Sequence, residues 1–160
     1  MTSDTIARRP YRPCVGVVLA NPAGQVFVGQ RADWTTPAWQ MPQGGIDPGE
    51  GPRDAGLREL QEETGVGAEL VTVEAETADW VAYDFPTEVA ATRWNGKFRG
   101  QTQKWLLARF HGQDDQIRID TEHPEFSEWK WVAPDAALAL IVPFKREVYA
   151  SVLAEFAGRI

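Results

Sequence analysis

The chain has 160 residues, 43% of them hydrophobic, and a formal net charge of −7. This composition excludes intrinsic disorder, and the length predicts one domain spanning residues 1–160. The acidic balance argues against extended nucleic-acid binding, because neutralisation of phosphates by basic side chains dominates that affinity. A phosphate-rich substrate still fits an acidic protein whose carboxylates hold cations, since bound ions reverse the local charge.

Hydropathy and cysteine content indicate the compartment. No apolar run approaches the roughly 20 residues that cross a bilayer, and the polar N-terminus lacks the apolar stretch of a secretory signal. Cys14 is the only cysteine, so no disulfide forms within the chain. We therefore expect a cytoplasmic protein with no membrane association, in which Cys14 is a small buried hydrophobe. The oligomeric state stays open.

The first elements are an arm and a hairpin. Residues 1–12 look like a partly mobile arm, and we assign 1–10 to a flexible segment. The continuous apolar, β-branched run 14–20 predicts a buried strand. After a turn, the alternating segment 25–31 predicts the second strand of a β-hairpin.

The clearest helix is expected at residues 52–65. Pro52 suits the first helical position, and Gly65 suits a left-handed stop. A loop at 32–38 and a short extended segment beginning at Trp39 separate this helix from the hairpin.

The second half predicts further strands and one more helix. A final helix is expected from about Phe144 to Ala157, where apolar side chains recur at helical spacing. Strands mixed with two well-separated helices predict an α/β sandwich. The expected strands are 69–76, about 80–83, 104–112 and 128–134.

Three glutamates share one face of the first helix. Glu59, Glu62 and Glu63 stand at i, i+3 and i+4, so their like charges repel one another. Such crowding is tolerable if hard cations lie between them, and carboxylate oxygens are preferred ligands of Mg²⁺ and Mn²⁺. Arg58 is expected to pair with Glu62 one turn later. An acidic helix face alone is more often merely solvated, so charge by itself does not establish a metal site.

The loop before this helix is rich in glycine. Residues 42–52, PQGGIDPGEGP, hold four glycines in eleven residues. Glycine lets the backbone approach a ligand closely and present its amides to anions. A glycine-rich loop that leads directly into a carboxylate-rich helix suits the binding of a pyrophosphate bridged by metal ions.

The spacing of these residues is ordered. Gly44 is followed after five residues by Glu50 and, after seven more, by Arg58-Glu59-Leu60, and then by Glu62-Glu63 and Gly65-Val66. This segment, 44–66, resembles the Nudix box at every defining position. The resemblance implies a Nudix-type α/β/α sandwich with a mixed central β-sheet, and hydrolysis of a nucleoside diphosphate linked to another group.

The resemblance also implies roles for the residues of the box. Glu59, Glu62 and Glu63 match the metal ligands at the catalytic centre, which would hold on the order of one to three ions of Mg²⁺ or Mn²⁺. Gly44, with Gly45, would shape the loop at the metal site. Arg58 would support the catalytic carboxylates. For Glu50 two interpretations stay open, an accessory carboxylate and an organiser of the loop.

Further segments outside the box narrow the substrate. They are similar to bacterial RNA pyrophosphohydrolases and to plant-type diadenosine tetraphosphate hydrolases over about residues 11–156. This implies a nucleotide or RNA 5′-end polyphosphate as substrate. The choice between RNA ends and dinucleoside polyphosphates stays open, as do the base preference and the identity of the general base. The matching segments are YRPCVGVVLAN, WQMPQGGID, TADWVAYDFP, GQTQKW, PEFSEWKWV and PFKREVY.

The same resemblance assigns residues outside the box. Glu125 matches a distant carboxylate that binds metal or activates water, although a lone loop glutamate is more often solvated. Phe144 and Lys145 would lie beside the base, where Phe144 either stacks on a purine or is simply the first core residue of the last helix. The remaining substrate-binding candidates are Arg12, Arg31 and Lys104, which would reach phosphates, together with Gln43 and Tyr83.

Two other functions compete with this hypothesis. A nucleotide-binding module that has lost catalysis should show damage in the box, and all defining residues are present. Another Nudix chemistry, such as cleavage of a nucleotide sugar, is disfavoured by the similarity along the whole chain.

The tryptophans do not indicate a further ligand site. Trp80 and four others in strand-like segments are expected to pack in the core or on the sheet. Trp34 and Trp94 receive no role.

Overall fold

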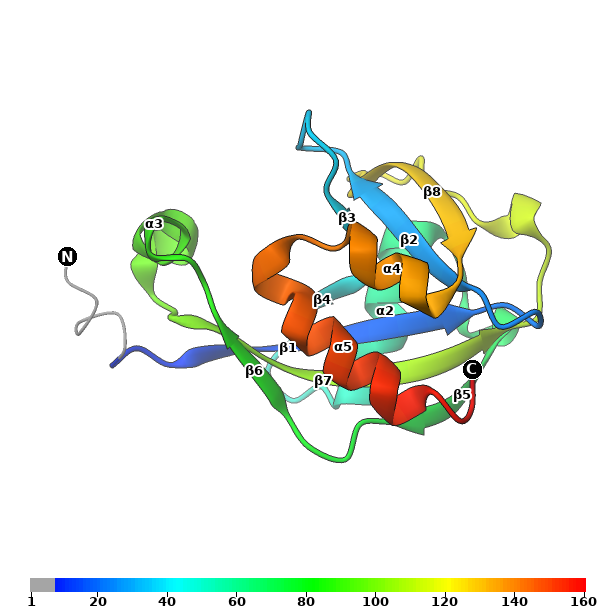
Figure 1. The fold of residues 1–160 in the computed structure, drawn as a ribbon, viewed down its shortest axis with the longest axis horizontal. Coiled ribbons are helices and arrows are strands. Elements are labelled where there is room, and N and C mark those ends of the chain that lie inside the picture. Colours follow the sequence, from blue (N-terminus) through cyan, green and yellow to red (C-terminus); the bar gives the residue numbers. More distant parts are fainter. Residues whose placement is uncertain (1–7) are drawn as a thin grey trace.

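The computed structural model of the protein describes residues 8–160, and its centre is a mixed β-sheet (Figure 1). The two longest strands, β1 (Tyr11–Ala20) and β7 (Gly100–Phe110), run parallel in the middle of the sheet. All other neighbouring strands pair antiparallel. The other strands are β2 (Val26–Arg31), β3 (Trp39–Gln40), β4 (Gln43–Gly45), β5 (Val71–Glu76), β6 (Val81–Asp84) and β8 (Phe126–Val132).

The order of the strands places both long strands next to segments that carry predicted site residues. The main path of the sheet is β3-β2-β1-β7-β5, while β4 pairs with β1, β6 with β7, and β8 with β2. The short strand β4 therefore lies on the N-terminal half of β1, where Gly44 faces Val15. Strand β6 lies on the N-terminal half of β7, where Tyr83 faces Gln101.

Helices cover both faces of this sheet, as the predicted α/β/α sandwich requires. Helix α2 (Pro52–Thr64) packs on one face, and α4 (Pro134–Leu140) and α5 (Arg146–Phe156) lie on the other (Figure 1). Helix α3 (Thr87–Thr92) is set apart from the others in the connection between β6 and β7. Within residues 8–160, no helix combines the length and the apolar character that crossing a membrane requires.

Alternation along the central strands divides the core in two. On β1, Val17 belongs to the cluster under α2 and Val18 to the cluster under α5. On β7, Leu106 and Leu107 divide in the same way. Because the sheet is buried on both faces, its central strands read as continuous apolar runs in the sequence rather than as alternating ones.

Both central strands are longer than predicted. Strand β1 begins at Tyr11 rather than at residue 14, and β7 begins at Gly100 rather than at 104. The two extensions pair with each other, starting at Tyr11 and Gly100. The polar residues of these extensions adopt strand structure because they pair with each other. Hydropathy along the sequence does not predict such pairing. The rest of the predicted arm, residues 1–7, lies outside the described residues.

Three further features differ from the sequence expectations. Helices α3 and α4 were not predicted, because six or seven residues offer too short a window for helical periodicity. Helix α5 begins at Arg146, since residues 143–145 form a 3₁₀ turn. The prediction that Trp80 packs in the core or on the sheet is wrong: its side chain is 46% exposed in the turn before β6.

Candidate functional site

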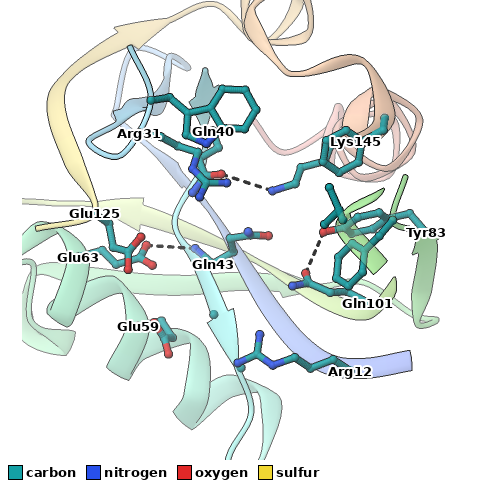
Figure 2. Close-up of a pocket in the computed structure, with 16 residues that line it drawn as sticks. Arg12, Arg31, Gln40, Gln43, Glu59, Glu63, Tyr83, Gln101, Glu125 and Lys145 are labelled. Carbon is teal, nitrogen blue, oxygen red and sulfur yellow. Dashed lines mark hydrogen bonds between the residues drawn. The ribbon is translucent and has the colours of Figure 1, made fainter. Parts of the chain in front are cut away.

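A cavity of about 310 Å³ opens between the C-terminal half of α2, strand β6 and the turn before α5 (Figure 2). Its lining changes character from one end to the other. The walls comprise carboxylates (Glu59, Glu63, Glu125), cations (Arg12, Arg31, Lys145), amides (Gln40, Gln43, Gln101), apolar or aromatic groups (Trp34, Tyr83, Phe85, Val89, Phe144) and the backbone of Gly44 and Gly45.

A second hollow, of about 430 Å³, adjoins the carboxylate end. It shares Glu59, Glu63 and Glu125 with the first cavity and adds Glu62. The side chain of Glu62 is 57% exposed. The three helical glutamates and Glu125 thus border one connected region, which the first cavity reaches from one side and the second from the other.

Glu63 is the most buried of these carboxylates. It is 4% exposed, and its Oε2 accepts a hydrogen bond of 3.1 Å from the backbone N–H of Gln43. Burial raises the pKa of Glu63 well above its ordinary value, and the charges of Glu59 and Glu125 raise it further. A carboxylate in this environment is stabilised by a cation.

Glu59 approaches the loop through a gap that only glycine leaves. A Cβ atom on Gly44 would lie 2.1 Å from the Glu59 carboxyl carbon, so no larger residue at 44 is compatible with this position of the carboxylate. Burial raises the pKa of Glu59, while its hydrogen bond from Arg58 opposes the rise. Gly44 therefore brings the helix and the glycine-rich loop together.

Arg58 connects the loop to the helix. Its Nε and Nη2 donate to the two Glu50 carboxylate oxygens at 2.9 Å each, and Nη2 also donates to the Gly45 carbonyl at 3.0 Å. Its Nη1 donates to Glu59 at 2.9 Å and to Glu62 at 3.3 Å. The predicted pairing of Arg58 with Glu62 is therefore present, and Arg58 restrains two of the three helical glutamates, Glu59 and Glu62, while it also holds Glu50.

Both carboxylate oxygens of Glu50 accept hydrogen bonds from neighbouring residues. Besides Arg58, it accepts a hydrogen bond of 3.1 Å from the backbone N–H of Asp47. Its bonds to Arg58 and Asp47 lower the pKa of Glu50 to about 2. Glu50 does not line the cavity, and this geometry supports the interpretation of Glu50 as an organiser of the loop.

Glu125 reaches the site from the segment before β8. Its backbone carbonyl accepts a hydrogen bond of 2.8 Å from the N–H of Ala32, which ties this segment to the loop that follows β2. Its charge acts on both Glu59 and Glu63. The tertiary structure thus places Glu125, which is distant in the sequence, beside the glutamates of α2.

These side chains fit a hard divalent cation. The donors are all carboxylate oxygens, which Mg²⁺ and Mn²⁺ prefer. Burial, together with the nearby Glu59 and Glu125, raises the pKa of Glu63, and a bound cation would offset both effects. Within residues 8–160, no three acidic, histidine or cysteine side chains converge into a compact metal cluster. This open arrangement suits ions that keep several waters and complete their coordination with substrate phosphates.

The cations border the middle of the cavity. Arg31 forms two bonds to Asp33, at 3.0 and 2.7 Å, and its guanidinium carbon lies 5.4 Å from the centre of the Trp34 ring. Arg12 donates to the Cys14 sulfur at 3.3 Å. Cys14 is buried as expected, and burial raises its pKa to about 11. Lys145 is 5% exposed, and its Nζ lies 3.4 Å from Gln40 Oε1.

An aromatic wall closes the other end. Phe144 is 37% exposed, and its ring centre lies 6.0 Å from that of Tyr83. Phe144 precedes α5 in a 3₁₀ turn and faces the cavity. This exposure supports the stacking interpretation over the interpretation of Phe144 as a core residue, because a core residue would be buried.

One predicted residue lies elsewhere, and several lining residues were not predicted. Lys104 lines neither hollow; its ammonium donates to the Thr77 and Ala78 carbonyls at 3.0 and 2.9 Å. The additional lining residues are Gln40, Gln101, Phe85, Val89 and Trp34. The first three lie in segments that carried the family resemblance, whereas α3, which supplies Val89, had no sequence signal.

The sequence as a whole matches known proteins closely. A family model described as NUDIX domain matches residues 10–152. A protein of Roseobacter denitrificans named RNA pyrophosphohydrolase is 58% identical over 160 residues, which is 100% of both chains. A protein of Dinoroseobacter shibae with the same name is 58% identical over 156 residues, covering 98% of each.

The fold also matches solved structures. The dihydroneopterin triphosphate pyrophosphohydrolase of E. coli superposes with a TM-score of 0.72 over 92% of this chain and 99% of that one. The C. elegans Ap4A hydrolase binary complex superposes with a TM-score of 0.64 over 91% of this chain and 98% of that one. Each is 22% identical in sequence, so both likenesses concern the fold alone.

Proposed function

The chain belongs to the Nudix family, and from this premise we propose that it is a metal-dependent pyrophosphohydrolase that acts on triphosphorylated RNA 5′ ends. In the proposed reaction one water is consumed and the bond between the α and β phosphates is broken. The products are pyrophosphate and an RNA with a 5′ monophosphate. Relatives that are 58% identical over the full chain and named for this activity support RNA ends over dinucleotides.

One observation carries the proposal: a single cavity joins carboxylates, cations and exposed aromatic rings. The carboxylate end suits divalent ions, which Nudix hydrolases generally use. Arg12, Arg31 and Lys145 suit the phosphates in the middle. Tyr83 and Phe144 offer rings for the base, and stacking contributes about 1–3 kcal/mol per base. These side chains follow the order of groups in a nucleoside polyphosphate.

The glutamates have distinct parts in the proposed chemistry. We assign Glu59, Glu62, Glu63 and Glu125 to the binding of Mg²⁺ or Mn²⁺. A bound ion would polarise the phosphorus, lower the pKa of a bound water and neutralise the leaving group. Arg58 keeps Glu59 and Glu62 oriented. A carboxylate oxygen of Glu125 or of a box glutamate takes the proton from the attacking water.

Cleavage of dinucleoside polyphosphates is a second candidate activity. The observation that favours it is a further exposed ring: Trp34, 39% exposed, lines the same cavity beside Arg31. A dinucleotide would bring two bases, for which Trp34 and Phe144 provide separate platforms. Diadenosine tetraphosphate would then yield ATP and AMP.

The metal role is tested by Glu62→Gln. The substitution removes a charged ligand while keeping the size of an exposed side chain, so the fold should remain intact. We expect Mg²⁺-dependent turnover to fall about a hundredfold or more, since a catalytic metal contributes several kcal/mol. Glu128→Gln, at an exposed glutamate on β8, is the matched control and should retain activity. Full activity of Glu62→Gln would contradict the assignment.

The substrate is tested by direct comparison. Wild-type protein with Mg²⁺ or Mn²⁺ is incubated with triphosphorylated RNA, diadenosine tetraphosphate, ADP-ribose and nucleoside triphosphates, and kcat/KM is measured for each. We expect triphosphorylated RNA to give the highest value. A higher value for ADP-ribose would instead support another Nudix chemistry.

A further inference from the structure

A chain of buried amides lies beside the cavity. Gln103 on β7 is 1% exposed and does not line the cavity, yet it contacts both Gln43 and Gln101, which do. The Trp105 indole N–H donates to Gln103 Oε1 at 2.9 Å. Gln103 Nε2 donates to Gln43 Oε1 at 3.0 Å and to Gln101 Oε1 at 2.8 Å. The Tyr83 hydroxyl donates to the same Gln101 oxygen at 3.0 Å.

The indole determines the orientation of every amide in this chain. An indole nitrogen only donates, so the Gln103 atom that faces it is the amide oxygen. Both hydrogens of the Gln103 amide then point to the oxygens of Gln43 and Gln101. Each of these two side chains is left with its NH₂ group. Within the part of the chain that the structure describes, neither NH₂ group donates to a protein acceptor, and both residues line the cavity.

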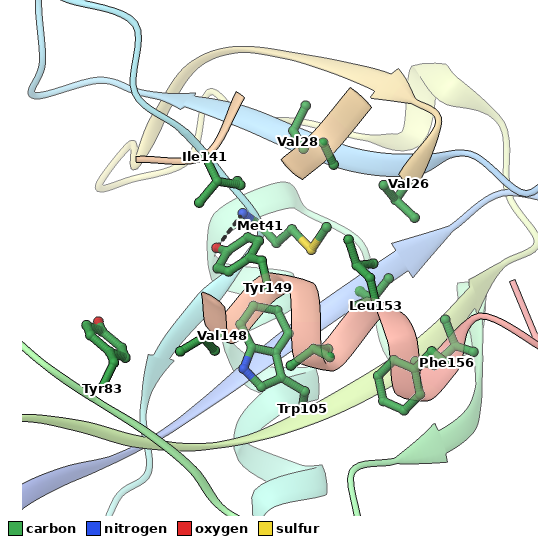
Figure 3. Packing of buried hydrophobic residues seen from close by; sticks show 14 of the residues in the cluster. Val26, Val28, Met41, Tyr83, Trp105, Ile141, Val148, Tyr149, Leu153 and Phe156 are labelled. Carbon is green, nitrogen blue, oxygen red and sulfur yellow. Dashed lines mark hydrogen bonds between the residues drawn. The ribbon is translucent and has the colours of Figure 1, made fainter. Parts of the chain in front are cut away.

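Trp105, the anchor of the chain of buried amides, is held rigidly in the core. Trp105 is fully buried, and its ring centre lies 5.1 Å from that of Tyr149 on α5. A Cβ atom on Gly16 would lie 2.5 Å from the indole, so β1 leaves room for this ring. Figure 3 shows the indole nitrogen on the side where Tyr83 lies. The packing of the core therefore fixes the direction in which the Trp105 indole N–H donates to Gln103.

A third amide in the cavity is turned in the same way. Lys145 Nζ lies 3.4 Å from Gln40 Oε1, and an ammonium, like an indole, only donates. In Figure 2 the Gln101 oxygen faces the Tyr83 hydroxyl, and the Gln40 oxygen faces Lys145. The oxygens of these three amides thus accept hydrogen bonds from protein donors, so the groups that the amides offer to a ligand in the cavity are their NH₂ donors.

We propose that Gln103, held by Trp105, is a positioning residue that presents the amides of Gln43 and Gln101 as donors to the phosphoryl oxygens of the substrate. The backbone N–H of Gln43 holds Glu63 at the carboxylate end, whereas Gln101 adjoins Tyr83 at the aromatic end. A polyphosphate that spans these ends passes both donors. Phosphoryl oxygens only accept, so they match NH₂ groups and would be repelled by amide oxygens. This inference rests on the proposed function.

The orientation is tested by NMR of the side-chain amides in ¹⁵N-labelled protein, assigned with Gln→Met variants. In the free protein we expect both Gln103 amide protons to be protected from exchange, because both are hydrogen-bonded. Inorganic pyrophosphate with Mg²⁺ should shift the Gln43 and Gln101 NH₂ signals more than those of Gln103. Protected NH₂ groups on Gln43 and Gln101 that do not respond to pyrophosphate would overturn the proposal.

The effect on catalysis is tested with Gln103→Met, which keeps the volume and removes the hydrogen bonds. We expect KM for triphosphorylated RNA to rise about tenfold, as for one lost hydrogen bond to a charged group, with kcat little changed. In a Gln43→Met/Gln101→Met background, Gln103→Met should raise KM no further. An equal further rise in that background would show that Gln103 does not act through these two residues.

A matched control separates positioning from stability. The Thr77 hydroxyl accepts the backbone N–H of Trp105 at 3.0 Å but contacts none of the amides. Thr77→Val should therefore lower Tm, as Gln103→Met does, without raising KM. A rise in KM in both variants would make the effect one of general destabilisation. Wild-type protein that fails to hydrolyse triphosphorylated RNA would contradict the proposed function instead.

Discussion

At the scale of single residues, the carboxylate site depends on the close approach of side chains to the glycine-rich loop. Gly44 admits the Glu59 carboxylate, and Gly45 admits Arg12, whose Nη2 atom would lie 2.3 Å from a Cβ at that position. Arg58 then restrains Glu59 and Glu62 through hydrogen bonds from one guanidinium. Gly44 and Gly45 are therefore explained by the side chains that lie against them, in addition to any ligand.

Gly44→Ala tests this explanation. The new Cβ would meet the far end of the flexible Glu59 side chain, so we expect the carboxylate to move while the fold persists. Displacing a metal ligand should reduce Mg²⁺-dependent kcat/KM by about 10- to 100-fold. Gly51→Ala is the matched control, because a Cβ there has no neighbour within 4 Å. Equal activity of the two variants would contradict the role given to Gly44.

At the scale of elements, helix α2 ends in a left-handed residue. Gly65 has φ 72°, and its N–H donates to the Gln61 carbonyl. The next segment is joined there, since the N–H of Arg118 donates to the Thr64 carbonyl at 2.6 Å. The end of the helix thus holds the segment that leads on toward Glu125, so helix capping and site assembly are connected.

Gly65→Ala should destabilise the protein. A residue with a Cβ costs about 1–2 kcal/mol in the left-handed region, and here the Cβ would also lie 3.1 Å from the Arg118 Cβ. We expect the free energy of unfolding in urea to fall by this amount. Gly158→Ala, where a Cβ has no neighbour within 4 Å, should leave it nearly unchanged. Unaltered stability of Gly65→Ala would argue against the capping role.

At the scale of the whole molecule, α5 connects the core to the site. Its Tyr149 packs on Trp105 in the sheet, and the Tyr149 hydroxyl accepts the backbone N–H of Met41 at 3.1 Å. Met41 lies two residues before Gln43, whose own N–H holds Glu63. One buried side chain therefore contacts the anchor of the amide chain and the segment that enters the glycine-rich loop.

Tyr149→Phe tests this connection. The substitution keeps the ring and leaves the buried Met41 N–H without its acceptor, which should lower the free energy of unfolding by about 1–3 kcal/mol. Hydrogen exchange at residues 41–45 should increase more than exchange at β8. Uniform exchange in both segments would mean that Tyr149 stabilises the fold without holding the loop.

The sequence by itself determined the local chemistry. The spacing of Glu59, Glu62 and Glu63 is set by the helical repeat, and Pro52 and Gly65 mark the helix ends, so these features followed without knowledge of the rest of the chain. The family and the α/β sandwich followed from the same motif and from the apolar runs, and both are confirmed.

Only the tertiary structure decided which distant residues meet. The parallel pairing of β1 with β7 aligns Arg12 with Gln101 and brings Gln103 next to Gln43, while it leaves Lys104 directed to the turn after β5. Strand register between segments some ninety residues apart has no local signature, because side chains of either face alternate in the same way. For that reason the helical carboxylates were predictable from their spacing, whereas Gln43 was assigned only through the family resemblance, and the contacts that Gln103 makes with Gln43 and Gln101 were not predicted.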